Sequence, residues 1–335
     1  MKKSDVIRMI FQMRDDFIAE PRQEKGLAFA PTNIALCKYW GKRNDELNLP
    51  ETSSLSIALP DKGAMTTVSL NQDASNDHII LNGKVLSPDS AFVKRVTEYL
   101  DLFRQEKQWH LKIDIKMNIP VAAGLASSAC GFASLVAALN DLFGWELSKR
   151  ELSLLARLGS GSASRSLWKG FVEWHAGVQS DGMDSYAEPI TMEWSDLRVG
   201  ILLMDEAEKQ ISSREAMRRT VTSSVLYASW PKKVSNDLLL LKQAMQTKNF
   251  PLFGGTAESN ALTMHASMLS SWPPVCYYLP ETIAAMHQVW NARKKGLELY
   301  FTQDAGPNLK LLFEEKDTKE VRAVFPEVEV IKVFE

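Results

Sequence analysis

The chain has 335 residues, enough for about two domains of ~150 residues each. Its 45% hydrophobic and 24% charged residues exclude a disordered or fibrous protein, and a net charge of −2 leaves no overall field to attract nucleic acid or a membrane. Three widely separated cysteines predict neither a disulfide framework nor a CxxC metal site, so we expect a reduced, cytoplasmic protein with no nucleic-acid or membrane partner.

Residues 1–25 are expected to form a helical extension. Apolar residues at helical spacing (Val6, Ile10, Met13 and Phe17) predict an amphipathic helix over residues 3–19. Charged residues interrupt this stretch, so it is neither a signal peptide nor a membrane span, and no run of about 18 apolar residues follows. Because the polar face is mixed in sign, we expect this helix to pack on the protein body rather than on a membrane surface.

Residues 26–118 are expected to form mostly strands. The segments that favour strands are 26–39, 66–70, 78–81, 84–86 and 111–117. Asn82-Gly83 predicts a tight hairpin turn between the third and fourth of these segments. Residues 89–104 have a helical pattern.

From residue 127 the apolar residues recur at the period of a helix. We expect a helix that Gly144 ends, and then a second helix with Ser148 and Glu151 as its capping box. The later elements expected are extended segments near 170–175 and 197–204, helices through 212–295 broken at prolines, a strand over 297–302, a helix from Pro307 and a strand over 328–334. The fold class is therefore α+β, with a strand-rich domain over 26–190 and a helix-rich domain over 191–335.

Two segments have the composition of anion sites. Residues 120–128 are small and precede a helix, so backbone N–H groups there could approach an anion, although a serine N-cap explains the same pattern. This loop has neither the P-loop nor the dinucleotide-binding pattern. Residues 159–166 place four serines and two glycines around Arg165, whose planar guanidinium suits a carboxylate or phosphate. A flexible linker is the alternative, and we favour an anion site.

Two further segments have both a structural and a functional interpretation. Residues 38–43 hold three cations around Tyr39 and Trp40, which fits a solvated strand end as well as a binding site. Asp304 follows a strand and precedes a turn, where an aspartate usually caps; it would be catalytic only if it faces the anion segments. Cys37 lies among apolar residues, which favours a packed thiol over a nucleophile. The five histidines show no zinc-ligand spacing.

Together these segments resemble the mevalonate diphosphate decarboxylases of the GHMP small-molecule kinase superfamily. The matching segments are 30–42 (APTNIALCKYWGK), 53–56 (SSLS), 120–128 (PVAAGLASS), 159–166 (GSGSASRS), 170–174 (GFVEW), 211–214 (ISSR) and 304–308 (DAGPN). The KYWGK and GSGSxxR segments are specific to the decarboxylases, whereas the PxxxGLxSSA loop is shared across the superfamily.

The resemblance implies decarboxylation of mevalonate 5-diphosphate to isopentenyl diphosphate, ADP, phosphate and CO₂, with ATP and Mg²⁺. Phosphorylation makes the tertiary hydroxyl a leaving group, and its loss builds positive charge that expels CO₂. The resemblance also implies a two-domain GHMP-kinase-like fold with an ATP-binding N-terminal domain, an active site in the cleft between the domains, and a homodimer.

The resemblance also implies residue roles. Asp304 would accept or orient the hydroxyl proton, Arg165 would hold the substrate carboxylate, and Lys38 would help with the transferring charge, with Asn33 near the reacting groups. The implied substrate-binding residues are Tyr39, Trp40, Gly41, Lys42, Ser160, Gly161, Ser162, Ala163, Ser164, Arg165, Ser213 and Arg214. The implied ATP-binding residues are Gly124, Leu125, Ala126, Ser127 and Ser128, with Ser127 or Ser128 as candidate Mg²⁺ ligands.

The chain departs from the family pattern at a few positions. Gln303 stands where an apolar residue is more common, Glu51-Thr52 replaces an apolar-Asn pair, and Ala216 replaces a common glycine. The first 25 residues have no clear counterpart in the family.

Three alternatives stay open. They are a kinase of mevalonate or its monophosphate, a decarboxylase that acts on the monophosphate, and a non-catalytic nucleotide-binding homologue. The joint presence of Lys38, Arg165 and Asp304 argues against the kinase and the non-catalytic homologue.

Overall fold

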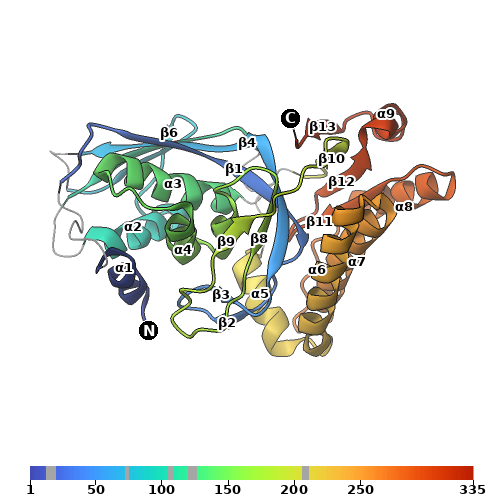
Figure 1. The fold of residues 1–335 in the computed structure, drawn as a ribbon, viewed down its shortest axis with the longest axis horizontal. Helices are drawn as coiled ribbons and strands as arrows, with labels where there is room; N and C mark the ends of the chain where they lie inside the picture. Colours follow the sequence, from blue (N-terminus) through green and yellow to red (C-terminus); the bar gives the residue numbers. More distant parts are fainter. Residues whose placement is uncertain (13–19, 72–74, 105–108, 120–126, 206–210, 335) are drawn as a thin grey trace.

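The computed structural model describes residues 1–12, 20–71, 75–104, 109–119, 127–205 and 211–334. Over these ranges the chain forms two larger β-sheets with helices packed on them (Figure 1). The fold is α+β, as the sequence predicts. Within the same ranges no helix is both long and apolar enough to cross a membrane.

The first sheet has seven strands in the order β6-β5-β7-β4-β8-β9, and β1 pairs with β4 outside this path. Its strands are β1 (Gly26–Cys37), β4 (Ser54–Leu70), β5 (His78–Leu81), β6 (Lys84–Val85), β7 (Leu111–Met117), β8 (Phe171–Trp174) and β9 (Ala187–Pro189). A separate small hairpin joins β2 (Lys42–Asn44) to β3 (Leu49–Pro50). The strands expected over 78–86 and 111–117 are therefore confirmed.

The pairing of β1 with β4 leads the chain into the interior. The register runs from Gly26 opposite Val68 to Cys37 opposite Leu55, with irregularities after Pro31 and after Ala35. From Ala30 onward every residue of β1 is buried, and all of them except Thr32 and Asn33 are apolar. Lys38, the residue that follows β1, consequently lies in the interior of the protein.

Helices of this half pack on the sheet or on one another. They are α1 (Lys3–Gln12), α2 (Ala91–Arg104), α3 (Ser127–Phe143), α4 (Lys149–Gly159) and the short 3₁₀ helix η1 (Gly161–Arg165). In Figure 1 α3 lies along β1 and β4, and α1 lies beside α2. The expected capping box of Ser148 and Glu151 is present at the start of α4, and Gly144 follows α3 with φ +60°.

The N-terminal helix is confirmed as far as Gln12, and residues 13–19 of the expected helix lie outside the described residues. Val6, Ile10 and Phe11 are buried on one face of α1. The ring of Phe11 lies 5.1 Å from that of Trp145. This helix therefore packs on the protein body.

The second sheet has four antiparallel strands in the order β11-β12-β10-β13. They are β10 (Leu197–Leu202), β11 (Tyr300–Gln303), β12 (Leu309–Glu314) and β13 (Glu329–Lys332). The helices of this half are α5 (Ser213–Ser223), α6 (Trp230–Thr247), α7 (Phe250–Leu269), α8 (Pro280–Lys294) and α9 (Thr318–Val324), with 3₁₀ helices η2 (Tyr227–Ser229) and η3 (Glu315–Asp317). Helix α7 contacts both β1 and β11, so it links the two sheets.

One feature of this half differs from expectation. The helix expected from Pro307 is wrong, because residues 309–314 form β12, a central strand that is buried on both faces and so shows no alternation. The expected breaks at prolines are confirmed, because α6 begins at Trp230, α7 begins at Phe250 and α7 ends before Pro273-Pro274. Pro231 and Pro251 stand in the first turns of α6 and α7, where a proline costs no hydrogen bond.

Candidate active site

A cavity of about 970 Å³ is lined by residues from both halves of the chain. It brings together segments that are far apart in the sequence: the end of β1, the start of η1, the N-terminus of α5 and the turn after β11. The predicted site residues that line it are Asn33, Lys38, Tyr39, Trp40, Lys42, Ser128, Ser160, Gly161, Ser162, Arg165, Ser213, Arg214 and Asp304. Its volume is at the upper end of the range for small-molecule sites, ~300–1,000 Å³.

Lys38 and Asp304 form an ion pair in the wall of this cavity. Lys38 Nζ donates to Asp304 Oδ1 at 2.8 Å and to the Ala35 carbonyl at 2.7 Å. The backbone N–H of Lys38 donates to Asn260 Oδ1 at 2.8 Å, which fixes the chain as it leaves β1. Asp304 therefore faces the anion segments, the condition under which the sequence interpretation makes it catalytic.

Burial shifts the pKa of the lysine in this pair. Lys38 is 2% exposed, and burial lowers its pKa to about 8, although the opposite charge of Asp304 counteracts part of the shift. His265 lies behind the pair, with Nε2 3.1 Å from the Asp304 carbonyl oxygen. Burial lowers the pKa of His265 to about 3, so this imidazole is neutral at physiological pH.

Arg165 is held in a fixed orientation. Its Nε and Nη2 each donate to Asn33 Oδ1 at 3.2 Å, and Nη1 donates to Ser54 Oγ at 2.6 Å. Asn33 is itself held, because its Nδ2 donates to Ser166 Oγ at 2.6 Å. Burial lowers the pKa of Arg165 to about 10, which leaves the guanidinium charged at neutral pH. The site thus keeps a rigid cation beside Asn33.

Hydroxyl groups gather where η1 begins. Ser160 Oγ lies 3.5 Å from Ser128 Oγ and 3.4 Å from Ser162 Oγ. A Cβ atom on Gly161 would come within 2.9 Å of the rings of Tyr39 and Trp174, so only glycine lets η1 pack this closely. Among the described residues the buried hydroxyl of Tyr39 has no hydrogen-bond partner.

Cations line another part of the cavity. Lys42 Nζ donates to Asn48 Oδ1 at 2.9 Å, and Arg95 and Arg214 line the same space. Burial, and then the charge of Arg214, lowers the pKa of Lys42. In the described part of the chain neither Arg95 nor Arg214 forms an ion pair. This group of cations therefore favours the binding of a polyanion.

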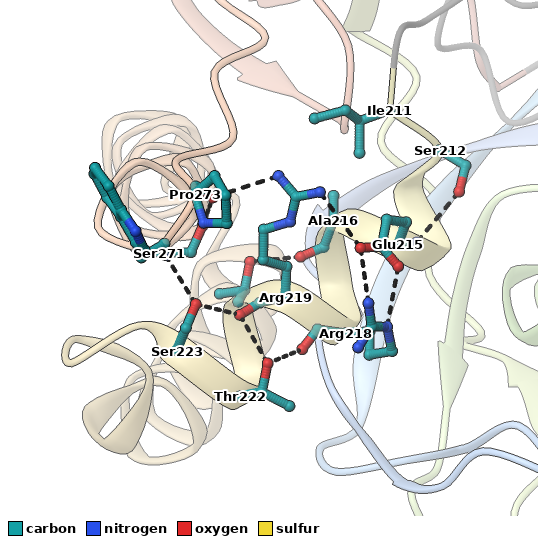
Figure 2. A network of polar contacts seen from close by, with 12 residues as sticks. Ile211, Ser212, Glu215, Ala216, Arg218, Arg219, Thr222, Ser223, Ser271 and Pro273 are labelled. Carbon is teal, nitrogen blue, oxygen red and sulfur yellow. Dashed lines mark hydrogen bonds and ion pairs between the residues drawn. The ribbon is translucent and has the colours of Figure 1, made fainter.

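A polar network holds the helix that carries Arg214 (Figure 2). Ser212 caps α5 by accepting from the backbone N–H of Glu215, and Glu215 in turn accepts from Arg218 and Arg219. Ser223 at the other end donates to the Arg219 carbonyl and accepts from the backbone N–H of residue 272 at 2.9 Å. The network anchors α5 to the turn that follows α7.

Family models match almost the whole chain. Residues 30–187 match the diphosphomevalonate decarboxylase-like N-terminal domain, and residues 199–332 match the mevalonate 5-diphosphate decarboxylase C-terminal domain. The diphosphomevalonate decarboxylase of Aspergillus fumigatus is 38% identical over 315 residues, which cover 87% of this chain and 77% of that protein. The chain belongs to the diphosphomevalonate decarboxylase family.

Solved structures agree with this assignment. A structure of mevalonate diphosphate decarboxylase from Enterococcus faecalis has a TM-score of 0.84 and 42% identity, and covers 91% of this chain and 95% of that one. The Staphylococcus aureus enzyme gives a TM-score of 0.86 at 36% identity, covering 93% of this chain and 96% of that one.

Some residues named from the family resemblance do not line the cavity. Ala163 and Ser164 are fully buried within η1, where Ser164 Oγ donates to the Gly161 carbonyl. Gly41 has φ +113° and packs against Tyr227, so its conformation shapes the turn after Trp40. Gly124, Leu125 and Ala126 lie outside the described residues, as does the side chain of Ser127.

Several residues in or beside the cavity are not indicated by the sequence motifs, and Lys310, Arg95, Asn260 and His265 are among them. Lys310 Nζ lies 3.5 Å from Asp304 Oδ2, and Arg95, Asn260 and His265 contribute as described above. Lys310 could have been found only with the correct assignment of β12. Nothing in the local sequence distinguishes Arg95, Asn260 or His265 from ordinary helix residues.

Proposed function

We propose that the chain catalyses the ATP-dependent decarboxylation of mevalonate 5-diphosphate to isopentenyl diphosphate, ADP, phosphate and CO₂. The observation that carries this proposal is the ion pair of buried Lys38 with Asp304 beside Arg165, in a cavity that also presents cations and hydroxyls suited to phosphates. A similar solved structure holds MVAPP, AMPPCP and magnesium, which supports the same ligands here.

Asp304 is proposed to accept or orient the proton of the tertiary hydroxyl. Its carboxylate lines the cavity, where it can come within hydrogen-bond reach of a substrate hydroxyl as general-base catalysis requires, and Lys38 Nζ donates to its Oδ1. Lys38, still protonated at neutral pH, would stabilise negative charge on the phosphoryl group as it transfers.

Arg165 is proposed to hold the substrate carboxylate. Loss of the new phosphate leaves positive charge on the tertiary carbon, and the electron pair of the carboxylate C–C bond then forms the alkene as CO₂ leaves. A carboxylate fixed by a rigid guanidinium keeps that bond aligned, and Asn33 fixes the guanidinium.

The diphosphate tail is proposed to bind the hydroxyls of Ser160 and Ser162 together with Lys42 and Arg214. The unpartnered hydroxyl of Tyr39 fits the same role, because a buried donor without a partner is costly until a ligand oxygen accepts from it. Trp40 also lines the cavity, and its buried Nε1 has no partner among the described residues. The remaining predicted residues of this group are Ser213 and Gly161. Their backbone N–H groups would donate to the phosphate oxygens.

ATP is proposed to bind in the part of the cavity lined by Leu81, Leu86, Phe92 and Met117, whose apolar surfaces suit a purine. Ser128 would meet its phosphates, and its neutral oxygen suits Mg²⁺ brought in with ATP. When bound, Mg²⁺ neutralises phosphate charge during transfer. Arg95 adds a cation beside the phosphates.

Three expectations about domain organisation, location and oligomeric state are also proposals. We propose an ATP-binding domain over 26–190 and a helix-rich domain over 191–335 with the active site in the cleft between them, a cytoplasmic location and a homodimer. The first sheet ends at Pro189 and the second begins at Leu197, which supports the division. The resemblance supports the dimer, and light scattering that gives a monomer mass would contradict it.

The test is to supply ATP with mevalonate, its 5-phosphate or its 5-diphosphate, and to measure CO₂ and ADP together. We expect equal amounts of both products, with by far the highest kcat/KM for the diphosphate. ADP without CO₂ would indicate a kinase, and equal kcat/KM for the monophosphate would overturn the substrate assignment. Neither product with any of the three would indicate a non-catalytic homologue.

A further inference from the structure

Lys310 occupies an unusual place for a lysine. It lies in β12, opposite Thr302 of β11 and Ile201 of β10, in the middle of the second sheet. Its side chain is 1% exposed, and its neighbours Leu309 and Leu311 are fully buried. A buried ammonium group is costly unless an opposite charge faces it, so this position needs a specific partner.

Asp304 is that partner. Lys310 Nζ lies 3.5 Å from Asp304 Oδ2, while Lys38 Nζ binds Oδ1 at 2.8 Å. Lys310 also donates to the Asn308 carbonyl at 3.3 Å, on the far side of the turn that follows Asp304. The two oxygens of one carboxylate are therefore each held by a lysine from a different strand end.

We propose that Lys310 is a positioning residue of the reaction, which fixes the plane of the Asp304 carboxylate and places a second positive charge beside the Lys38–Asp304 pair. This inference rests on the proposed function, in which Asp304 and Lys38 act on the substrate. Lys310 acts through these two residues rather than on the substrate, because it does not line the cavity.

The electrostatic part follows from the groups that face Lys38. These are Asp304, Lys310, Arg165 and the neutral His265. Of the charged ones only Asp304 favours the ammonium form, whereas Lys310 and Arg165 disfavour it. Removal of the Lys310 charge must therefore raise the pKa of Lys38.

The first test is Lys310→Met, which keeps the length of the side chain and removes its charge. We expect kcat to fall about 10²-fold through misplacement of the carboxylate, with the KM for mevalonate 5-diphosphate near that of the wild type. The alkaline limb of the kcat–pH profile should move to higher pH. A normal kcat with an unmoved limb would overturn the proposal.

A matched control tests for a merely structural role. Arg198 is a buried cation in β10 of the same sheet, paired with Glu315 Oε2 at 2.7 Å, and it does not line the cavity. Arg198→Met should lower Tm while kcat and the pH profile stay unchanged. If Arg198→Met moves the alkaline limb as far as Lys310→Met does, the effect is not specific to Lys310.

Lys310→Arg keeps the proposal testable if the methionine variant does not fold. Because it retains the charge, it should lower kcat while the alkaline limb stays where it is in the wild type. A limb that moves to higher pH in Lys310→Arg would contradict the electrostatic role.

The role of Lys310 can be tested even if the proposed reaction is not observed. If the wild type releases no CO₂, the proton affinity of Lys38 can still be followed by NMR titration of its Nζ resonance. A higher Lys38 pKa in Lys310→Met would support the inference, and an unchanged one would overturn it.

Discussion

We expect Arg165→Lys to separate phosphorylation from decarboxylation. Arg165 is 3% exposed and uses three N–H groups, from Nε, Nη1 and Nη2, to bind Asn33 and Ser54. Since a guanidinium has five N–H groups, one on Nη1 and one on Nη2 stay available among the described contacts. Two adjacent N–H groups form the fork that a carboxylate accepts.

The magnitude follows from this arrangement. Lysine keeps the charge but has no planar fork, so it cannot bind the substrate carboxylate through two parallel N–H groups while it holds Asn33. A hydrogen bond to a charged group contributes about 1.5–3 kcal/mol, and ~1.4 kcal/mol is tenfold in rate. We therefore expect the CO₂-releasing step to slow about ten- to a hundredfold, with a smaller effect on phosphorylation.

The assay measures ADP and CO₂ in a single turnover with mevalonate 5-diphosphate. In Arg165→Lys, CO₂ should lag behind ADP, whereas in the wild type the two form together. Arg157→Lys is the control, because Arg157 is a buried arginine that binds the carbonyls of Gly182 and Ser185 and does not line the cavity. Equal rates of ADP and CO₂ formation in Arg165→Lys would refute the assigned role.

Three further predictions follow from the site. Arg214→Ala should raise the KM for mevalonate 5-diphosphate about ten- to a hundredfold, because a charged contact to the diphosphate is lost. The control Arg218→Ala, on the same helix, should leave this KM unchanged, and an unchanged KM in Arg214→Ala would show that Arg214 does not bind the diphosphate. Ser128→Ala should raise the KM for MgATP. It should leave Tm unchanged, because the substitution opens no cavity. Normal turnover at limiting ATP would mean that Ser128 has only a structural role in the first turn of α3. In the kcat–pH profile, kcat should fall as pH rises through about 8, because burial lowers the pKa of Lys38 to that value and the protonated form predominates only below it. A kcat that stays constant well above this pH would contradict a role for the ammonium group.

The sequence predicts most elements of the fold because their signals are local. The capping box of Ser148 and Glu151 and the Asn82-Gly83 turn each depend on residues a few positions apart. Strand β12 was mistaken for a helix because burial on both faces removes the alternation that marks a strand. The length of β4, which runs back to Ser54, depends on pairing with β1 that no local pattern records.

The site shows the same limit. Motifs indicate Lys38, Arg165 and Asp304, but 266 positions separate Lys38 from Asp304, and only the packing of the two sheets makes them a pair. Lys310 was missed with β12. The departure at Gln303 has a structural reason: its buried Nε2 donates to the Gly306 carbonyl at 2.8 Å and closes the turn after Asp304.

The central claim is that Asp304 acts on the substrate hydroxyl, and Asp304→Asn tests it most directly. Asparagine keeps the size of the side chain but cannot accept the proton, so kcat should fall by at least about 10²-fold with the KM near that of the wild type. ADP and CO₂ should fall together, because phosphorylation precedes the loss of CO₂. Asp196→Asn, an exposed change beside the second sheet, should leave kcat unchanged. Near-normal kcat in Asp304→Asn would contradict the mechanism.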